Sequence, residues 1–433
     1  MKKINVGMLG IGNIGTGTYR ALEQNKETVE SRTGLSIEIV KILNRHPEKD
    51  RGIDIPKEKY TADVSEILDD PSIDIIVELI GGIEPATEYM LRAMKNGKHV
   101  VTANKAAIAA NGEELSRTAM ENHVLFRFEA SVAGGIPIIN SITQALTVNQ
   151  FDEVTGILNG TTNYILTAMT EFGRDYKDVL KDAQAKGFAE ADPTADVEGL
   201  DAGNKLSILT SLVFGMKVLP EEIPTNGISS ITKEDIGFAK DFGYKIKLLG
   251  SAKQDGKEIA CSVEPALVPN DHPLASVENE FNAVFLTGNA VDKLMFYGRG
   301  AGPLPTGSAV MGDVIEVSRS IAKGAAFDEV PLLRYDADLT FIGEGTSSYY
   351  IRLDASDIPG VLSAVADSFA EQGISIKTVL QRANSDSSQD AVPLIFIVHK
   401  TDRNMLNLAL ESIKKISAVR EIKNVLRVLD EEA

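Results

Sequence analysis

Short apolar runs and helix-like segments alternate along the first 130 residues of the chain. The apolar runs predict strands at Ile4–Gly10, Leu35–Leu43, Ile73–Ile80, His99–Asn104 and Val124–Ala130. Pro85–Gly97, between two of these strands, has Pro at its start and Gly at its end, which is typical of a helix. This alternation predicts an α/β domain with a doubly wound parallel sheet over residues 1–130.

The pattern changes after residue 130. Helical periodicity at Thr162–Phe172 and Gly203–Phe214 is mixed with strand-like segments at Phe151–Leu158 and Lys245–Ala252. We therefore predict a second, α+β domain over residues 131–304. A further helical pattern follows, and we expect residues 305–330 to return to the first domain.

A polar stretch rich in Gly and Ser toward its end predicts a linker over residues 331–348. The remaining residues, 349–433, show strands and helices in the order β-α-β-β-α-β. This order predicts a ferredoxin-like domain.

Composition narrows the class of protein. The 433 residues are 43% hydrophobic and 24% charged, as in ordinary globular proteins. A net charge of −18 argues against nucleic-acid and anionic membrane partners, and no apolar run reaches the roughly 18 residues of a membrane span. With Cys261 as its one cysteine, the chain cannot form an internal disulfide. We therefore expect a cytoplasmic protein.

The first predicted strand ends in the sequence GIGNIG, Gly10–Gly15. In this pattern Gly10 permits a tight turn, Gly12 lets the backbone approach a pyrophosphate, and Gly15 permits close helix–strand packing. Asn13 and Ile14 then begin the helix whose N–H groups face the phosphates. The motif predicts a Rossmann-type dinucleotide site. Arg45, after the second strand, stands where NAD sites usually carry an acid, which favours NADP and leaves NAD open.

A second stretch with candidate chemistry runs from Glu190 to Leu209. It contains the carboxylates Glu190, Asp192, Asp196, Glu198 and Asp201, followed by a single cation, Lys205. Asp201 and Lys205 share a helical stripe with Ile208, Leu209 and Leu212, which predicts that Lys205 faces inward. A surface ion pair with Asp201, worth about 0.3–0.5 kcal/mol, is the alternative. We favour the inward position, with Asp192 and Glu198 as solvated loop acids.

Several motifs occur together in one order: GIGNIG, VELIGGIEPATEYMLRAMKNGKHVVTANKA, FEASVAGGIPII, LNGTTNYIL, GFAEADPTADVEGLDAGNK and GRGAGPLPTGSAVMGD. Over roughly residues 1–330 the chain resembles homoserine dehydrogenase, and DIPGVLSAVADSFAEQGISI in the last segment resembles an ACT domain. The resemblance implies NAD(P)H-dependent interconversion of L-aspartate 4-semialdehyde and L-homoserine, a step toward threonine, methionine and isoleucine. It further implies a substrate and dimerisation role for the second domain.

The resemblance also assigns residue roles. It implies that Lys205 is the proton donor and acceptor, that Lys105 is a second catalytic lysine contacting cofactor and substrate, and that Glu190 and Asp201 bind homoserine. Asp196 is then a supporting acid, and Thr161 lies near substrate or cofactor. Gly187 and Gly302 match backbone contacts to the cofactor. A sodium ion is implied at Glu129 and at the carbonyl groups of Val132, Gly134 and Ile136, with oxygen ligands that suit a hard cation.

Two other functions compete with this one. A phosphorylating semialdehyde dehydrogenase needs a cysteine nucleophile, but Cys261 lies in a strand-like segment without an activating group nearby in sequence. A non-catalytic, nucleotide-linked amino-acid sensor is the second alternative, and the presence of both Lys105 and Lys205 argues against it. For the ACT-like domain, an amino-acid effector such as threonine and a dimerisation role without ligand both stay open. We expect a homodimer or homotetramer.

Overall fold

The computed structural model describes residues 1–433 except 47, 325–331, 334, 337, 382–390 and 430–433. The chain forms two compact units, each assembled from three segments of the sequence. Unit 1 contains Met1–Val154, Asn204–Glu222 and Phe281–Leu339, and unit 2 contains Thr155–Gly203, Ile223–Glu280 and Thr340–Ala433. No helix in the described ranges combines the length and apolar character that a membrane crossing requires.

Unit 1 is built on a six-stranded sheet with the order β3-β2-β1-β4-β5-β6, in which every neighbouring pair is parallel. Its strands are β1 (Lys2–Leu9), β2 (Leu35–Leu43), β3 (Tyr60–Thr61), β4 (Ile75–Glu78), β5 (His99–Thr102) and β6 (Phe126–Arg127). The order reverses direction between β1 and β4, which is the arrangement of a doubly wound sheet. The predicted fold class is confirmed for this unit.

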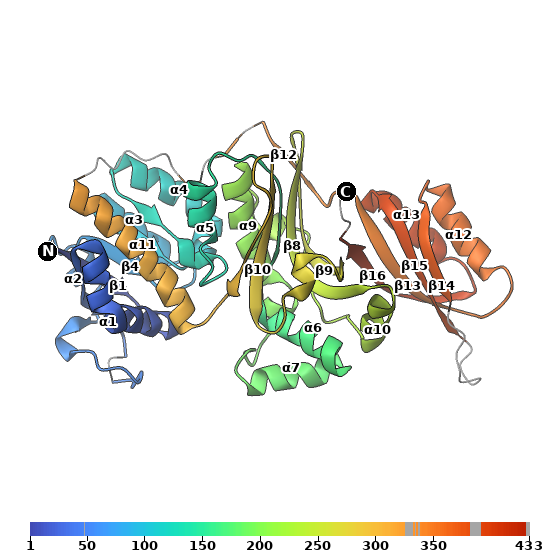
Figure 1. The fold of residues 1–433 in the computed structure, drawn as a ribbon, viewed down its shortest axis with the longest axis horizontal. Helices are drawn as coiled ribbons and strands as arrows, with labels where there is room; N and C mark the ends of the chain where they lie inside the picture. The colour runs from blue at the N-terminus through green and yellow to red at the C-terminus, as the bar shows by residue number, and fades with distance from the viewer. Residues whose placement is uncertain (47, 325–331, 334, 337, 382–390, 430–433) are drawn as a thin grey trace. The chain divides into compact units, whose positions relative to one another are not determined.

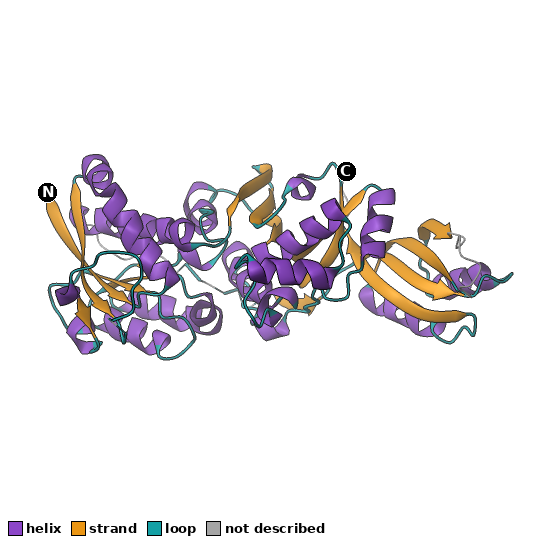
Figure 2. Ribbon diagram, turned by 90° about the horizontal axis from the view of Figure 1, so that it is seen from below, coloured by secondary structure: helices purple, strands orange, loops and turns teal. Residues whose placement is uncertain are grey.

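Helices cover both faces of this sheet (Figure 2). They are α1 (Asn13–Thr33), α2 (Ser65–Leu68), α3 (Ala86–Lys95), α4 (Lys105–Glu121) and α11 (Pro303–Lys323). Helix α11 packs along α1, and the two helices bury Tyr19, Leu22, Val310 and Val314 against apolar residues of β1, β2 and β4. Sequence positions far beyond residue 130 therefore complete the core of the dinucleotide-type sheet.

Shorter elements complete unit 1. They are η1 (Lys57–Lys59), η2 (Glu129–Ser131), α5 (Ile138–Asn140), η3 (Ser141–Ala145), η4 (Pro220–Glu222) and the antiparallel pair β10 (Phe281–Gly288) and β11 (Asp292–Arg299). The boundary between the two units falls within β7 (Phe151–Ile157) and within α9 (Leu200–Phe214).

Unit 2 contains a sheet with the order β8-β9-β16-β13-β15-β14. Its strands are β8 (Tyr244–Asp255), β9 (Glu258–Pro269), β13 (Ser347–Ala355), β14 (Ile376–Gln381), β15 (Val392–Thr401) and β16 (Val419–Val428). Its other elements are α6 (Gly160–Phe172), α7 (Tyr176–Ala185), α8 (Thr194–Val197), α10 (Lys233–Asp241), η5 (Pro273–Ser276), α12 (Val361–Glu371) and α13 (Arg403–Ile413). All of these elements except α8 and η5 are labelled in Figure 1.

The C-terminal part of unit 2 has the predicted ferredoxin-like order β13-α12-β14-β15-α13-β16. Its own core contains Tyr349, Ile351, Phe369, Phe396 and Leu406. Its outer strand β16 pairs in parallel with β9, with Arg427 opposite Ala266 and Val428 opposite Leu267. The predicted linker contains a strand of its own, β12 (Thr340–Gly343), which also pairs with β9.

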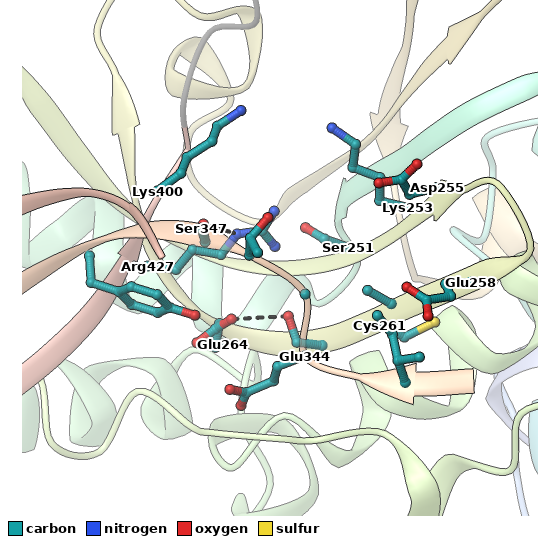
Figure 3. A pocket seen from close by; sticks show the side chains of 16 residues that line it. Ser251, Lys253, Asp255, Glu258, Cys261, Glu264, Glu344, Ser347, Lys400 and Arg427 are labelled. Carbon is teal, nitrogen blue, oxygen red and sulfur yellow. Dashed lines mark hydrogen bonds between the residues drawn. The ribbon is translucent and has the colours of Figure 1, made fainter. Parts of the chain in front are cut away.

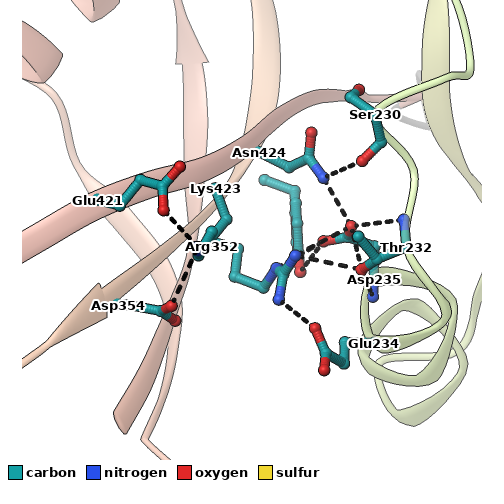
Figure 4. A network of polar contacts seen from close by, with 10 residues as sticks. Ser230, Thr232, Glu234, Asp235, Arg352, Asp354, Glu421, Lys423 and Asn424 are labelled. Carbon is teal, nitrogen blue, oxygen red and sulfur yellow. Dashed lines mark hydrogen bonds and ion pairs between the residues drawn. The ribbon is translucent and has the colours of Figure 1, made fainter. Parts of the chain in front are cut away.

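A buried polar network joins α10 to the ferredoxin-like strands (Figure 4). At its centre Asp235, which is fully buried, lies in the first turn of α10 and forms a capping box with Thr232. The Asp235 carboxylate accepts hydrogen bonds from Asn424 Nδ2 at 2.6 Å and Arg352 Nη2 at 3.2 Å, and Arg352 Nε lies 2.7 Å from it. The Asp235 carboxylate thus caps α10 and neutralises a buried arginine of strand β13.

Candidate functional site

The β1–α1 loop has the geometry of a dinucleotide loop. Gly10 has φ of +100°, and a Cβ there would lie 2.8 Å from the carbonyl oxygen of Leu79. A Cβ on Gly15 would lie 2.6 Å from the carbonyl oxygen of Gly10, so this glycine lets α1 start close to β1. Gly12, the N-cap of α1, has open space around it and no side-chain cap. The first N–H groups of α1 are therefore left for an anion, which fits a pyrophosphate.

Gly302 belongs to the same region of unit 1. It has φ of +117° and is the N-cap of α11, followed by Pro303 at the first helical position. A Cβ on Gly17 would lie 1.9 Å from the carbonyl oxygen of Pro303, so the start of α11 packs directly on α1. The structure thus brings the Gly302 turn next to the first turns of α1, as a cofactor contact requires.

The end of β2 presents an amide and arginines. Asn44 is 6% exposed, and its Oδ1 accepts hydrogen bonds from the backbone N–H of His46 at 3.0 Å and from Arg51 Nη2 at 3.1 Å. Asn44 Nδ2 is buried without a hydrogen-bond partner. Arg51 Nε donates to the carbonyl of Ile11 at 2.7 Å, which ties this loop to the glycine loop. Arg45 is exposed beside them. A buried amide donor and an exposed guanidinium fit a ribose and its 2′-phosphate.

Lys105 is the first residue of α4, directly after β5, and is half-buried. A cation at a helix N-terminus opposes the helix dipole, so this position is by itself unfavourable for a lysine. The preceding Asn104 accepts from the N–H of Ala107 at 3.2 Å and donates to the carbonyl of Gly82 at 2.7 Å. Glu78, fully buried, accepts from Thr102 Oγ1 at 2.6 Å. These contacts fix the backbone that carries Lys105.

In unit 2 the side chain of Asn159 joins two of the predicted acids. Its Nδ2 donates to Asp196 at 2.7 Å and to Asp201 at 2.9 Å, while its Oδ1 caps α6 by accepting from the N–H of Thr162 at 2.9 Å. Asn159 is 4% exposed and Asp201 is 9% exposed. One amide thus holds two carboxylates together beside a helix N-terminus, in an arrangement that suits the ammonium group of an amino acid.

Helix α9 carries both Asp201 and Lys205, four residues apart and therefore on the same face. Both residues are 9% exposed, so the inward position predicted for Lys205 is confirmed and the surface-pair alternative is excluded. A buried lysine is costly unless charged or polar partners surround it, and such lysines are common where proton transfer is needed.

The other predicted substrate residues also lie in unit 2, in the neighbourhood of α7. Thr161 Oγ1 donates to the carbonyl of Phe188 at 2.7 Å. The backbone carbonyl of Glu190 accepts from Gln184 Nε2 at 3.0 Å, while the Glu190 side chain is exposed. Gly187, with φ of +76°, is in the exposed turn between them. Gly187 and Glu190 thus lie on the short segment after α7, and Thr161, in the first turn of α6, contacts that segment at Phe188.

The residues predicted to hold sodium surround a buried carboxylate in unit 1. Glu129 is 3% exposed and accepts from the N–H groups of Ile139 at 2.8 Å and Asn140 at 2.7 Å. Burial raises the pKa of Glu129 against the effect of these hydrogen bonds. The carbonyl of Ile136 already accepts from the N–H of Ile138 at 2.8 Å. Among the described residues, no group of three or more His, Cys, Asp or Glu side chains is placed to hold a metal ion.

Sequence reasoning missed the contacts that position the predicted site residues, although the resemblance implies that Asn159 lies near substrate or cofactor. Glu78 ends an apolar strand, and Asn44 and Arg51 look like ordinary loop residues, so periodicity gives no sign of their contacts. Asn159 had a weak signal, because Asn is a preferred N-cap and precedes a helical pattern. Its bridging of two acids 37 and 42 residues away depends on tertiary structure alone.

Comparison with known families gives three matches along the chain. Residues 10–129 match the NAD-binding domain of homoserine dehydrogenase, residues 137–315 match the homoserine dehydrogenase catalytic family, and residues 349–418 match the ACT domain. The chain is 40% identical to the homoserine dehydrogenase of Bacillus subtilis over 99% of both chains.

Solved structures agree with the sequence comparisons. A homoserine dehydrogenase from Thiobacillus denitrificans is 40% identical, covers 99% of both chains and has a TM-score of 0.92. A hyperthermophilic archaeal homoserine dehydrogenase in complex with NADPH is 27% identical, with a TM-score of 0.63 over 73% of this chain and 98% of its own.

Proposed function

The chain belongs to the homoserine dehydrogenase family, as an NAD(P)-dependent oxidoreductase that interconverts L-aspartate 4-semialdehyde and L-homoserine, and we propose that its chemistry depends on Lys205. The observation that carries this proposal is the placement of Lys205, 9% exposed, one helical turn after Asp201 on α9. Because one helix holds both groups, their separation is fixed. A substrate whose ammonium group is held at Asp201 then has its reacting oxygen within reach of Lys205.

In this proposal Asp196 and Asp201, joined by Asn159, hold the substrate ammonium group together with Glu190. During reduction, negative charge develops on the aldehyde oxygen. The Lys205 ammonium group stabilises that charge and donates a proton to the oxygen. During oxidation, the Lys205 amine accepts the proton of the homoserine hydroxyl. Thr161 contributes to the wall of the substrate site.

Lys105 is the second catalytic residue that we propose. The nicotinamide cofactor, when bound, supplies or accepts the hydride. Lys105 follows the carboxyl end of β5, the edge at which doubly wound sheets bind ligands. There its ammonium group orients the substrate against the cofactor. Gly187 and Gly302 complete the cofactor contacts through their backbone.

We infer a preference for NADP over NAD. Arg45 is exposed at the end of β2, where a guanidinium pairs with a 2′-phosphate, and the buried Asn44 Nδ2 has no protein partner there. The archaeal relative whose structure contains NADPH supports this choice. Replacing Arg45 by Gln is expected to raise KM for NADP by about tenfold or more and to leave KM for NAD unchanged, since a charged hydrogen bond contributes roughly 1.5–3 kcal/mol. Arg32→Gln, at the opposite end of α1, is the control.

Three further assignments complete the proposal. Sodium is proposed at Glu129 with the carbonyl groups of Val132, Gly134 and Ile136, because a carboxylate keeps acceptor capacity beyond the two N–H groups that Glu129 binds. Thermal unfolding in sodium chloride against choline chloride tests this site. We also propose at least a dimer, and a cytoplasmic location in keeping with an enzyme of amino-acid biosynthesis.

The test of the central proposal follows cofactor absorbance while the protein reacts with L-homoserine and NADP or NAD. Lys205→Ala is expected to lower kcat by about 10²–10⁴-fold, the usual contribution of a general acid–base group. Lys217→Ala is the matched control, because Lys217 pairs with Glu113 at 2.9 Å with both side chains about half exposed. Equal rates for wild type and Lys205→Ala would reject the role of Lys205. Absence of turnover with either cofactor would favour a sensor.

A further inference from the structure

The segment after α7 carries two residues with a proposed ligand role. Gly187 and Glu190 are exposed on it, whereas Ala189 between them is buried. The segment folds back on α7, because the N–H groups of Phe188 and Ala189 donate to the carbonyl of Ala183 at 2.8 and 3.2 Å. These hydrogen bonds fix the segment to α7. The side chains that join it to α6 therefore decide where its ligand groups stand relative to that helix.

One face of α6 contacts Phe188 at two points. Thr161 and Tyr164 are three residues apart on α6 and therefore share this face. Thr161 Oγ1 donates to the carbonyl of Phe188 at 2.7 Å. The rings of Tyr164 and Phe188 lie 4.8 Å apart between centroids, at an interplanar angle of 43°. Such a tilted aromatic pair is favourable in addition to the area that it buries. Helix α6 thus contacts both the main chain and the side chain of one residue.

Lys186 contacts the same tyrosine from the other direction. Its Nζ donates to the Tyr164 hydroxyl at 2.7 Å and lies 5.3 Å from the centroid of the ring. A lysine at the end of a helix commonly pairs with an acid one turn earlier, but Asp182 at that position pairs with Arg174. Tyr164 therefore contacts the two residues on either side of Gly187.

Helix α6 is also the reference for the other acids of the substrate site. Its N-cap, Asn159, donates to Asp196 at 2.7 Å and to Asp201 at 2.9 Å. Asn159 and Tyr164 lie within the first turns of one helix, so the distance between them is fixed. Glu190 follows two residues after the Tyr164 contact. The position of Glu190 relative to the other two acids therefore depends on Tyr164.

Ordinary surface packing is the alternative role for this cluster. Phe188 keeps 37% of its surface exposed, and Lys186 is exposed as well. The contacts with Tyr164 therefore bury little apolar area and contribute little to the stability of the fold. What they do is to fix the direction of a segment that has no other contact of this kind named above.

We propose that Tyr164 is a positioning residue of the active site, which holds Gly187 and Glu190 where cofactor and substrate meet them. This inference rests on the function proposed above, because that function gives the two residues their ligands. Lys205 belongs to α9 and keeps its place on that helix without Tyr164. Loss of Tyr164 should therefore weaken substrate binding more than it slows the chemical step.

The test compares Tyr164→Ala with Tyr164→Phe in the oxidation of L-homoserine by the full-length protein. Tyr164→Ala should raise KM for L-homoserine about three- to tenfold, because both the ring pair and the hydrogen bond are lost. Its kcat should stay within about twofold of the wild-type value. Tyr164→Phe keeps the ring pair, so its KM should stay within about twofold of wild type. Thermal unfolding of each variant shows that it folds.

A double-variant cycle tests the contact with Lys186. Lys186→Met and Tyr164→Phe remove the same hydrogen bond, so the combined variant should have the KM of either single variant. Effects that multiply would contradict the contact. The matched control is Lys400→Met, which removes an exposed lysine of β15 at the wall of the cavity shown in Figure 3 and should keep the wild-type KM.

Two results would overturn the positioning role. One is a wild-type KM in Tyr164→Ala. The other is equal impairment of Tyr164→Ala and Tyr164→Phe, which would assign the effect to the hydroxyl group and not to the ring contact. Absence of turnover in the wild type would instead refute the proposed reaction. Titration with NADPH, which needs no turnover, then still tests the position of Gly187: we expect weaker binding by Tyr164→Ala, and equal binding would refute the inference.

Discussion

Asn159 is a single residue on which two proposed roles depend. Its side chain caps α6 and also holds Asp196 and Asp201. In Asn159→Ala the two carboxylates lose their shared donor and repel each other, so the ammonium site is misplaced. We expect KM for L-homoserine to rise by about tenfold or more, with a loss of roughly 1 kcal/mol in stability from the missing cap.

The N-cap residue of α13 provides a control that separates the effect on KM from the effect on stability. Asp402 caps α13 by accepting from the N–H of Asn404 at 2.8 Å, far from the proposed substrate residues in sequence. Asp402→Ala should lose similar stability, measured by urea unfolding, while KM for L-homoserine stays at the wild-type value. If both variants change KM equally, Asn159 acts through stability alone.

A single buried residue, His99, makes the stability of the fold depend on pH. Burial, with a smaller effect of Arg127, lowers the pKa of His99 to about 4, and its Nδ1 accepts from the N–H of Leu125 at 2.9 Å. The unfolded chain takes up this proton near pH 6.5 and the folded chain does not. The stability associated with neutral His99 is therefore present above pH 6.5 and is lost progressively as pH falls toward 4.

We expect this residue to account for about 2 kcal/mol of lost unfolding free energy between pH 7.5 and pH 5. In His99→Asn, urea unfolding should show a correspondingly smaller difference between the two pH values. His123→Asn serves as control, because His123 is exposed and Asn tolerates its φ of +54°. An unchanged pH difference in His99→Asn would contradict this assignment.

Two glycines near the start of helix α1 have different roles, one in cofactor binding and one in helix packing. Gly12 and Gly17 are five residues apart, yet a Cβ on Gly12 meets nothing within 4 Å and a Cβ on Gly17 would lie 1.9 Å from Pro303 O. Gly17→Ala must separate α1 from α11 and should lower stability by about 3 kcal/mol or more. Gly12→Ala should keep the wild-type melting temperature.

Two measurements should therefore distinguish Gly12→Ala from Gly17→Ala. Thermal unfolding should report a large decrease for Gly17→Ala and none for Gly12→Ala. Titration with NADPH should report weaker binding for Gly12→Ala, because its Cβ occupies the space through which a pyrophosphate approaches the backbone. Wild-type NADPH affinity in Gly12→Ala would place the phosphates elsewhere.

Local sequence patterns predicted where helices and strands form better than they predicted which segments pair or make contact. Strands β1, β2, β4, β5 and β6 of unit 1 follow from apolar runs, whereas β3, β10 and β11 were not predicted. The inward position of Lys205 follows from the stripe on α9. The strand β12 was predicted as part of a linker, because a segment of only four residues becomes a strand only when β9 offers it hydrogen bonds. The contacts of Glu78 and Asn159 were not predictable for the same reason, since their partners are distant in sequence.

At the scale of the whole molecule, the network around Asp235 ties the ACT domain to α10. Arg352→Met leaves the Asp235 carboxylate buried without its cation, and such a loss typically costs about 3–5 kcal/mol. Lys423→Met removes a cation that pairs at the surface with Asp354 and Glu421 and should cost less than about 1 kcal/mol. Urea unfolding of both variants measures the difference. Similar decreases in the free energy of unfolding for both variants would mean that the buried network does not stabilise the contact between the ACT domain and α10.

The parallel pairing of β16 with β9 has a consequence for any attempt to study the catalytic part alone. Residues 266 and 267 of β9 pair with β16, and residues 258–260 pair with β12, so both partners belong to the chain beyond residue 339. Cutting the chain there would leave β9 paired with β8 on one side only and expose unpaired N–H and carbonyl groups on its other side, which attract strands from other molecules. The chain beyond residue 339 is therefore expected to limit aggregation as well. A shortened protein would need another segment to cover the free edge of β9 to remain soluble.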